Sequence, residues 1–387
     1  MLEELKKKFI ELYGDGEIRV FHSPGRVNLI GEHIDYNGGY VFPCALEFGT
    51  YGLVRARKDK KVNFASTNFD LKVSMDLDNV VYKKEDDWAN YPKGVMKVME
   101  SEGFKLGGMD ILISGNIPNG AGLSSSASLE VLTAVIIDTL FNEGKTDRVE
   151  LVKISQKAEN TFVGVNCGIM DQFAVCMGRV NEAILLDCGT LKYNYAKIEL
   201  GNYTLVIMNT NKRRALNESK YNERRAECDE ALVILKKERP IEALCDLTIE
   251  EFKLLDNKLT KVNVRNRAKH AVYENERTKE AFNYLNEGKL LSFGKLLTES
   301  HNSLRDLYEV TGMELDTIVS ESLKATGCIG ARMTGAGFGG CAIALVEKDK
   351  VENFTKEVKE GYTKVIGYEP SFYLSGVGEG THEVINN

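Results

Sequence analysis

The chain has 387 residues, which is long for a single hydrophobic core and suggests two domains. It is 43% hydrophobic and 28% charged, and its net charge of −7 gives no support to a protein that binds nucleic acid or a membrane surface. The eight cysteines form no CxxC pair and no zinc pattern with histidine, so we expect a reducing compartment, the cytoplasm. No segment points to an obligate protein partner.

The first half of the chain alternates between expected strands and helices. Residues 1–13 are charged and amphipathic, which is typical of a helix and not of a signal peptide. No apolar segment is long enough to cross a membrane. The expected strands are residues 18–22, 40–46, 51–57, 62–66, 71–75 and 109–114. The expected helices are residues 88–102, 124–142, 147–162 and 171–178.

Helices dominate the second half. They are expected through most of residues 213–326, after strands near 183–187 and 203–209. Strands return at 341–346 and 369–375, around a helix at 349–361. Strands first and helices later predict an α+β fold with two domains and mixed or antiparallel sheets. We expect the domains to be residues 1–201 and 202–387, with the break at Gly201-Asn202.

A dense set of polar side chains lies in SPGRVNLIGEHIDYNGG, residues 23–39, between two expected strands. Such a turn on a rigid scaffold is typical of a binding loop. Glu32, His33 and Asp35 supply hydrogen-bond donors and acceptors that suit a ligand rich in hydroxyl groups. A polar surface turn is the alternative, and the density of charge beside apolar residues makes it the weaker one.

The sequence NGAGLSSSAS, residues 119–128, connects an expected strand to an expected helix. Gly120 and Gly122 allow the backbone to approach a ligand closely. The helix start directs unpaired N–H groups and a positive dipole end at that ligand, which favours an anion such as a triphosphate. The serine hydroxyls that follow can reach phosphate oxygens or Mg²⁺. A serine-capped helix after a glycine turn is the alternative.

Two other glycine patterns do not fit common nucleotide motifs. The only GK[ST] sequence, at residues 144–146, lacks the leading glycine of a Walker A loop. Gly335-x-Gly337-x-x-Gly340 has dinucleotide spacing, but it is expected to follow a polar turn and to lead into a strand. We interpret it as a glycine-rich loop that closes over the site, with a simple tight turn as the alternative.

One carboxylate stands among apolar residues, in NCGIMDQF, residues 166–173. Asp171 is flanked by Ile169, Met170 and Phe173, so partial burial is expected, and a buried carboxylate needs a partner. An aspartate at the start of a helix is also a good N-cap. The residues alone do not decide between a functional group and a cap.

Residues 23–39 closely resemble the galactokinase signature. Residues 115–131 and 327–340 resemble the second and third motifs of the wider family that includes homoserine, mevalonate and phosphomevalonate kinases. The three motifs occur in the family order over most of the chain, and the first is specific to the galactokinase branch. The resemblance implies phosphorylation of α-D-galactose by ATP at the anomeric hydroxyl, giving galactose 1-phosphate and ADP for galactose metabolism, in a cleft between the domains.

The resemblance also implies site residues. It implies that Asp171 is the catalytic base and that Arg26 lies beside it and keeps it ionised. The implied sugar contacts are Glu32, His33, Asp35, Gly168 and Tyr221. The implied ATP contacts are Gly120, Ala121, Gly122, Leu123, Ser124, Ser125, Ser126, Trp88 near adenine and, as a weaker candidate, Ser66. The implied Mg²⁺ ligands are Ser126 and Glu159.

Several of these assignments have alternatives. Without the resemblance, Tyr221 would be a helical residue that packs on a neighbour, and a lone tryptophan such as Trp88 is more often part of a core. The polar, proline-containing surroundings of Trp88 are unusual for a core residue, however. The rival functions are a kinase for N-acetylgalactosamine or arabinose, and a sensor that binds galactose and ATP without catalysis. The intact GLSSSAS sequence favours the enzyme over the sensor.

Overall fold

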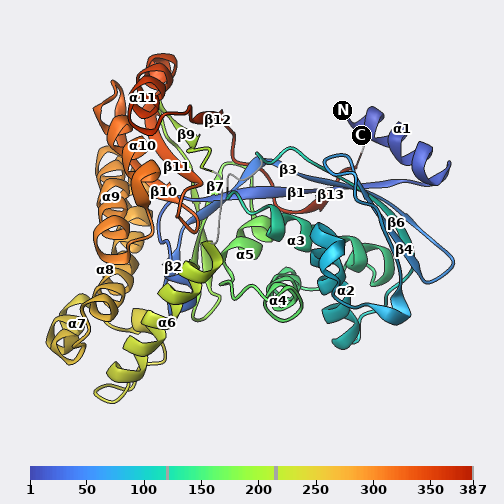
Figure 1. Ribbon diagram of the computed structural model, residues 1–387, viewed down its shortest axis with the longest axis horizontal. Coiled ribbons are helices and arrows are strands. Elements are labelled where there is room, and N and C mark those ends of the chain that lie inside the picture. The colour runs from blue at the N-terminus through green and yellow to red at the C-terminus, as the bar shows by residue number, and fades with distance from the viewer. Residues whose placement is uncertain (119–121, 213–216, 386–387) are drawn as a thin grey trace.

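The computed structural model of the protein describes residues 1–118, 122–212 and 217–385. Within these residues the chain forms three sheets, of six, four and three strands, and helices that run from α1 to α11 (Figure 1). The sheets are mixed or antiparallel. The expected α+β class is therefore confirmed.

The first sheet has the strand order β13-β1-β3-β6-β4-β5. Its neighbours pair antiparallel except for β4 and β6, which pair in parallel. Its strands are β1 (Arg19–Asn28), β3 (Pro43–Ala56), β4 (Lys61–Ser66), β5 (Val73–Asp76), β6 (Met109–Gly115) and β13 (His382–Glu383). The last strand of the chain therefore lies at the edge next to the first.

The two faces of this sheet bury alternate residues, because side chains along a strand point to opposite sides. On one face the aligned residues Val20, Leu53 and Leu112 meet Leu5 and Phe9 of helix α1 (Leu2–Tyr13). The other face contacts α3 (Ser125–Phe141) and α5 (Met170–Met177), and α2 (Asn90–Ser101) and α4 (Arg148–Ala158) pack against α3. Figure 1 shows α2 to α5 below the sheet and α1 above it.

Helix α3 is the centre of this first half. Its residues from Ala127 to Asp138 are all buried, and it contacts α2, α4, α5, β1 and β3. A helix that is apolar on every side must be surrounded by other elements. Its N-terminus is thereby fixed beside the end of β1, which positions the phosphate loop.

The second half contains the four-stranded sheet, in the order β10-β11-β9-β12. Its strands are β9 (Tyr203–Asn209), β10 (Cys328–Thr334), β11 (Cys341–Glu347) and β12 (Ser371–Leu374). The helices of this half are α6 (Asn217–Leu235), α7 (Ile249–Leu255), α8 (Val262–Asn286), α9 (Leu290–Ser303), α10 (Gly312–Lys324) and α11 (Val351–Ile366). They stand together in yellow to red on the left of Figure 1.

A three-stranded sheet lies between these parts, with β2 (Tyr40–Val41), β7 (Glu182–Asp187) and β8 (Tyr193–Lys197). Short 3₁₀ turns are η1 (Asp35–Asn37), η2 (Leu77–Asn79), η3 (Lys84–Ala89), η5 (Leu244–Asp246), η6 (Asp256–Lys258) and η8 (Lys348–Lys350). Two π-turns are η4 (Glu159–Val163) and η7 (Leu304–Tyr308). The chain passes from the three-stranded sheet to the four-stranded sheet between β8 and β9. The domain break was predicted there, at residue 201, and the division into two domains at this point stays a prediction.

Several expected boundaries were wrong. The polar segment was expected to begin as a turn at residue 23, but β1 continues to Asn28 through a register shift between Pro24 and Arg26. A proline usually marks the end of a strand because it cannot donate a ladder hydrogen bond. Here the register shift accommodates Pro24 within β1. The strands expected at 40–46 and 51–57 are the short β2 and one continuous β3. Strands β8, β10 and β13 were not expected at all.

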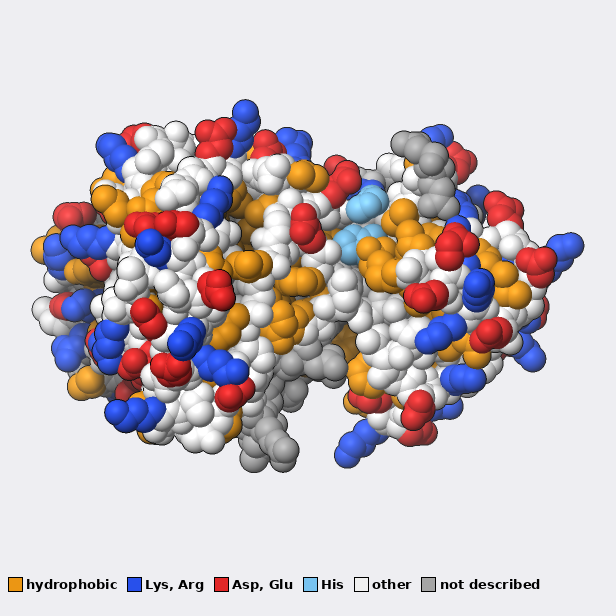
Figure 2. Space-filling model, turned by 90° about the horizontal axis from the view of Figure 1, so that it is seen from above, with side chains coloured by type: hydrophobic (Ala, Val, Ile, Leu, Met, Phe, Trp, Pro, Cys, Tyr) orange, Lys and Arg blue, Asp and Glu red, His pale blue; other side chains and the backbone are white. Residues whose placement is uncertain are grey.

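Figure 2 displays one face of the molecule, on which charged and hydrophobic side chains are mixed. Acidic and basic side chains are interspersed there, without a broad field of one sign. Among the described residues, no helix combines the length and apolar character that a membrane crossing requires.

Candidate active site

A cavity of about 280 Å³ is lined by side chains from both halves of the chain. The residues singled out in the sequence that line it are Arg26, Glu32, His33, Asp35, Glu159, Gly168, Asp171 and Tyr221. They come from the end of β1, the loop that follows it, η4, the start of α5 and helix α6. The loop between β10 and β11 contributes Gly335, Ala336 and Phe338.

Arg26 and Asp171 form a bidentate ion pair at this cavity. The Nε of Arg26 donates to Oδ1 of Asp171 at 2.8 Å, and its Nη2 donates to Oδ2 at 2.6 Å. Burial works to lower the pKa of Arg26, but the Asp171 charge raises it above its ordinary value. Ser124 also donates to Oδ2 of Asp171. Such a planar two-point contact fixes the position and orientation of the carboxylate.

Asp171 is not a helix cap. Helix α5 has Ile169 as its N-cap, and no side-chain hydrogen bond caps it. The Asp171 side chain turns toward Arg26 and remains 32% exposed at the cavity, whereas the Arg26 side chain is only 4% exposed. A carboxylate that is oriented by Arg26 and exposed to the cavity can accept a proton or a hydrogen bond from a ligand. The cap alternative is therefore wrong.

The loop after β1, residues 29–39, carries three of the predicted sugar contacts and is called the sugar loop below. Its Glu32 is 1% exposed and accepts from Nδ2 of Asn28 at 2.8 Å and from the backbone N–H of Gly335 at 2.7 Å. These contacts tie the sugar loop to the loop between β10 and β11. Glu32 lines the cavity with its orientation already set by the protein.

His33 uses both ring nitrogens within the protein. Its Nε2 lies 3.1 Å from the carbonyl oxygen of Ala336, and its Nδ1 lies 2.8 Å from the hydroxyl of Tyr36. A carbonyl oxygen only accepts, so Nε2 carries the proton and Nδ1 accepts from Tyr36. Burial, with a contribution from His270, lowers the pKa of His33 to about 3, so the ring is neutral. His33 forms a wall of the cavity, and its contact with a sugar stays a prediction.

Asp35 and Gly168 lie in direct contact. A Cβ on Gly168 would lie 1.8 Å from Oδ2 of Asp35, so only glycine leaves room for this carboxylate. Burial, followed by repulsion from Asp171, raises the pKa of Asp35 to about 7. Tyr221 closes the same side of the cavity, with its ring centre 5.5 Å from that of His33. Two carboxylates, those of Asp35 and Asp171, therefore line one cavity.

The predicted phosphate loop lies at the N-terminus of α3. Helix α3 begins at Ser125, directly after Ser124, which adopts a left-handed conformation with φ of 63°. Nη1 of Arg26 donates to the carbonyl oxygen of Gly122 at 2.9 Å. This contact joins the loop to the Arg26–Asp171 pair. Of the predicted ATP contacts, Gly120 and Ala121 lie outside the described residues, while Gly122, Leu123, Ser125 and Ser126 lie at or before the helix start.

A second group of buried acids includes Glu159, which lines the cavity, and Glu130. Nε2 of Gln172 donates to Oε2 of Glu159 at 2.7 Å and to Oε2 of Glu130 at 3.0 Å. Burial raises the pKa of both glutamates, and their proximity raises that of Glu130 further. Oε1 of Glu130 has no hydrogen-bond partner among the described residues. Unsatisfied buried acceptors of this kind would gain from a nearby cation.

These oxygens fit Mg²⁺, which prefers hard oxygen ligands and keeps part of its shell for phosphate and water. The described residues contain no group of three or more His, Cys, Asp or Glu arranged to hold a metal ion. A metal held by Glu159 and Ser126, with ATP oxygens and water completing its shell, is consistent with that finding. The Mg²⁺ assignment stays a prediction.

Trp88 and Ser66 lie outside the cavity. Trp88 is 9% exposed and packs edge-on against Phe64 at 6.3 Å between ring centres. The expectation that its polar neighbours keep it out of the core is therefore wrong. Its Nε1 has no hydrogen-bond partner within the described part of the chain. Ser66 ends β4 and accepts from the N–H of Asn68 at 3.0 Å. The proposed nucleotide contacts of both residues stay predictions.

The glycine-rich loop, residues 335–340, is a hairpin connection and not a dinucleotide-binding turn. It follows strand β10, where a polar turn had been expected, and it leads into β11. The N–H of Phe338 donates to the carbonyl oxygen of Val310 at 2.6 Å. Gly335, Ala336 and Phe338 of this loop line the cavity, and a Cβ on Gly335 would lie 3.3 Å from the carbonyl oxygen of Gly122 in the phosphate loop. Closure of the loop over the site stays a prediction.

Comparison with known proteins decides the family. Three family models match the chain: the galactokinase galactose-binding signature at residues 7–56, the N-terminal domain of GHMP kinases at residues 90–179 and the C-terminal domain of GHMP kinases at residues 281–364. A galactokinase from Clostridium tetani is 64% identical over 99% of this chain and 98% of its own. The chain belongs to the galactokinase family.

Other galactokinases are similar to this chain in sequence and in structure. A galactokinase from Clostridium beijerinckii is 55% identical over 98% of each chain. The structure of Lactococcus lactis galactokinase complexed with galactose superposes with a TM-score of 0.97, at 51% identity, over 99% of this chain and 100% of that one. Mevalonate kinase from Methanococcus jannaschii, at 20% identity and a TM-score of 0.66, shares the fold.

Several residues of this galactokinase-family site carried no signal in the sequence. Glu130 and Gln172 lie inside the matched motifs, but helix periodicity gives no reason to select them. Glu274 and Arg332 lie far from the sugar loop in sequence and contact it only in the folded chain. Helix α8 is rich in charged residues, so its buried members look like part of a solvated face.

Proposed function

We propose that the protein transfers the γ-phosphoryl group of ATP to the anomeric hydroxyl of α-D-galactose, giving α-D-galactose 1-phosphate and ADP. The observation that carries this proposal is the Arg26–Asp171 pair, which lies between the sugar loop and the phosphate loop at one cavity. Membership of the galactokinase family supports it. Entry of galactose into central metabolism is the corresponding role.

Catalysis follows from positioning and charge. Asp171 accepts a hydrogen bond from the anomeric hydroxyl and takes its proton as the bond to phosphorus forms. Arg26 orients the Asp171 carboxylate through its bidentate contact and brings positive charge to the transferring group. In phosphoryl transfer, most of the acceleration comes from orienting the reactants and neutralising the phosphate charge.

The sugar is recognised by groups on both sides of the cavity. We assign sugar contacts to Glu32, His33, Asp35, Gly168 and Tyr221. The support is that all five line the cavity. Carboxylates that the protein already orients discriminate strongly between sugars with different hydroxyl positions. A missing hydroxyl leaves a buried acceptor unpaired.

The nucleotide is held at the start of α3. We assign the phosphates to Gly120, Ala121, Gly122, Leu123, Ser124, Ser125 and Ser126, and the adenosine end to Trp88 and Ser66. Support comes from the helix N-terminus, which favours anions. Ser126 and Glu159 would hold Mg²⁺, which supplies charge neutralisation of the ATP phosphates when it is bound. The eight cysteines all lie within the described residues and form no disulfide, which supports a cytoplasmic location.

The test is release of ADP by the purified protein with ATP, Mg²⁺ and one sugar at a time. The sugars are galactose, N-acetylgalactosamine, arabinose and glucose. We expect galactose to give the highest kcat/KM and glucose, which differs at C4, to be at least roughly tenfold worse because Asp35 then lacks a hydroxyl partner. A higher kcat/KM for N-acetylgalactosamine or arabinose would reassign the substrate. Galactose binding without ADP release would identify a sensor.

A further inference from the structure

The backbone of the sugar loop is held by helix α8, more than 230 residues later in the chain. The N–H of Gly31 donates to Oε1 of Glu274 at 3.1 Å. One turn earlier in α8, Nε2 of His270 lies 3.1 Å from the carbonyl oxygen of Glu32. A carbonyl only accepts, so His270 donates there, and its Nδ1 accepts from Ser303 at 2.8 Å. One face of α8 therefore contacts two neighbouring peptide groups of the sugar loop.

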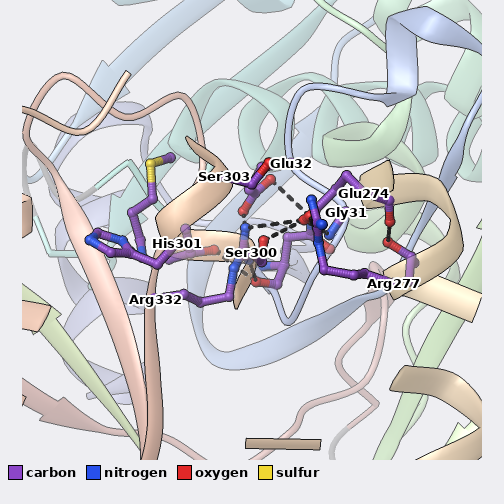
Figure 3. A network of polar contacts seen from close by, with 12 residues as sticks. Gly31, Glu32, Glu274, Arg277, Ser300, His301, Ser303 and Arg332 are labelled. Atoms are coloured by element: carbon purple, nitrogen blue, oxygen red, sulfur yellow. Dashed lines mark hydrogen bonds and ion pairs between the residues drawn. The ribbon is translucent and has the colours of Figure 1, made fainter. Parts of the chain in front are cut away.

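Glu274 is also the centre of a buried polar network, which Figure 3 displays. It is fully buried, and its Oε2 accepts from Nε of Arg277 at 2.8 Å. Ser300 donates to its Oε1. Nη2 of Arg332 lies 3.9 Å from the same oxygen. Burial alone would raise the pKa of Glu274, but Arg277, His270 and Arg332 together lower it to about 2.

Arg332 connects this network to the cavity. Its side chain is fully buried on β10. Nη1 donates to the carbonyl oxygens of Asn28 and Leu29 at 3.2 and 3.1 Å, and to Oε1 of Glu32 at 3.3 Å. The Arg332 guanidinium therefore lies between Glu274 and the Glu32 carboxylate that lines the cavity. Each end of Glu32 is fixed: its backbone by His270, its carboxylate by Arg332.

Such a network is poorly explained by stability alone. Buried ion pairs often contribute no more than apolar residues of the same volume, because the desolvation of the charges offsets their attraction. This cluster does fix the position of the backbone segment that it contacts, because hydrogen bonds are short-range and directional. The segment that it positions is the one that carries Glu32, His33 and Asp35.

We propose that Glu274 is a positioning residue for the sugar: with His270 and Arg332 it holds Gly31 and Glu32 in the arrangement that binds galactose. The inference rests on the proposed function, because it assumes that the cavity binds galactose. It assigns part of the sugar affinity to a helix of the second half that does not itself line the cavity.

The test is Glu274→Gln, which keeps the side-chain volume and removes the charge between Arg277 and Arg332. The amide also places its NH₂ donor toward either Arg277 or the Gly31 N–H, and both of these need an acceptor. We expect the galactose Kd, measured by calorimetry without nucleotide, to rise about tenfold, the scale of one lost charged hydrogen bond. The galactose KM should rise with it. The ATP KM should stay within about twofold, on the same scale.

The matched control is Glu276→Gln, on the same helix. Glu276 pairs with Lys279 at 2.8 Å at the surface, and both side chains are more than one-third exposed. It undergoes the same chemical change without touching the network, so its galactose Kd should equal that of the wild type. Ser300→Ala is a second, milder probe, because it removes one donor to Glu274 and leaves every charge in place.

The outcomes separate the two proposals. A folded Glu274→Gln variant with unchanged galactose Kd would overturn the positioning role. Parallel loss of galactose and nucleotide affinity would overturn it too, because it indicates general damage. If Glu274→Gln does not fold, Ser300→Ala decides: a raised galactose Kd supports the role, and an unchanged one overturns it. Failure of the wild type to bind galactose would instead overturn the proposed function and this inference together.

Discussion

At the scale of single residues, the Arg26–Asp171 pair makes the sharpest prediction. Asp171→Asn keeps the side-chain volume and removes the negative charge that orients the anomeric hydroxyl and accepts its proton. We expect kcat to fall by about 10²–10⁴-fold, the usual contribution of a general base, while galactose and ATP affinities change much less. Steady-state kinetics together with binding calorimetry checks both statements.

Asp306→Asn is the matched control. Arg305 and Asp306 also form a bidentate pair, at 2.8 and 2.9 Å, but on the exposed surface. The same change there should leave kcat unaltered. An Asp171→Asn variant with kcat within a few fold of wild type would show that Asp171 only orients its neighbours.

Asp35 makes the sugar site sensitive to pH. Its pKa is raised from 3.8 to about 7 by burial and by Asp171. Both oxygens of a carboxylate accept hydrogen bonds, so galactose affinity should rise as the pH increases from about 6 to about 8 and Asp35 ionises. Calorimetric titration across this range measures it, and Asp35→Asn should remove the dependence. An equally steep pH dependence in that variant would assign the titration to another group.

The same shift affects stability with the opposite sign. Between pH 3.8 and about 7 the folded state binds more protons at Asp35 than the unfolded state does. Stability from this group is therefore fully present below pH 3.8 and is lost as the pH rises through about 7. The unliganded protein should become less stable over that range, and Asp35→Asn should flatten this part of the profile.

At the scale of elements, the glycine-rich loop between β10 and β11 depends on one close approach. Gly337 has φ of 82°, and a Cβ there would lie 2.3 Å from the carbonyl oxygen of Val310. Gly337→Ala should therefore displace the loop, lower kcat/KM at least roughly tenfold and cost about 1–3 kcal/mol of stability. Kinetics and thermal unfolding measure the two effects.

Gly103→Ala is the control for backbone strain. Gly103 has φ of 87° and nothing within 4 Å of an added Cβ. It should lose stability by about 1–2 kcal/mol, from the left-handed backbone alone, and keep its kinetics. Equal kinetic effects in the two variants would show that the loop position is irrelevant to turnover.

The elements also show what a sequence can predict. Helices α3 and α5 and the strand β9 were expected within a few residues, because apolar periodicity and glycine boundaries mark them clearly. Strand β10 was missed because GARMT contains a glycine and a fully buried Arg332, which are unusual in a strand. The side-by-side placement of Arg26 and Asp171, which lie in motifs, was predicted. The network around Glu274 was not, because it exists only once α8, α9 and β10 pack against the sugar loop.

At the scale of the whole molecule, the buried contacts between the sugar loop and α8 should make the two halves unfold together. Trp88, the only tryptophan, lies in the first half, while the helices α6 to α11 dominate the second. Tryptophan emission and far-ultraviolet circular dichroism should therefore report one coincident thermal transition. Galactose at 100 times its Kd should stabilise both by about 2.7 kcal/mol. Two separate midpoints, or a shift in only one signal, would show that the halves are energetically independent.

The edge of the first sheet has a consequence for synthesis. Strand β13 comes from residues 382–383, pairs with Phe21 and His22, and is fixed there by two hydrogen bonds of 2.6 Å between Arg19 and Glu383. Because Glu383 follows Arg19 by 364 residues, a ribosome must add all of them before β1 acquires its outer neighbour. Until then, β1 exposes unpaired backbone groups, which are a template for association with other chains. The nascent first half is thus the stage at which a chaperone would matter most, and a truncation of only the last six residues should increase aggregation during expression while leaving every cavity residue in the chain.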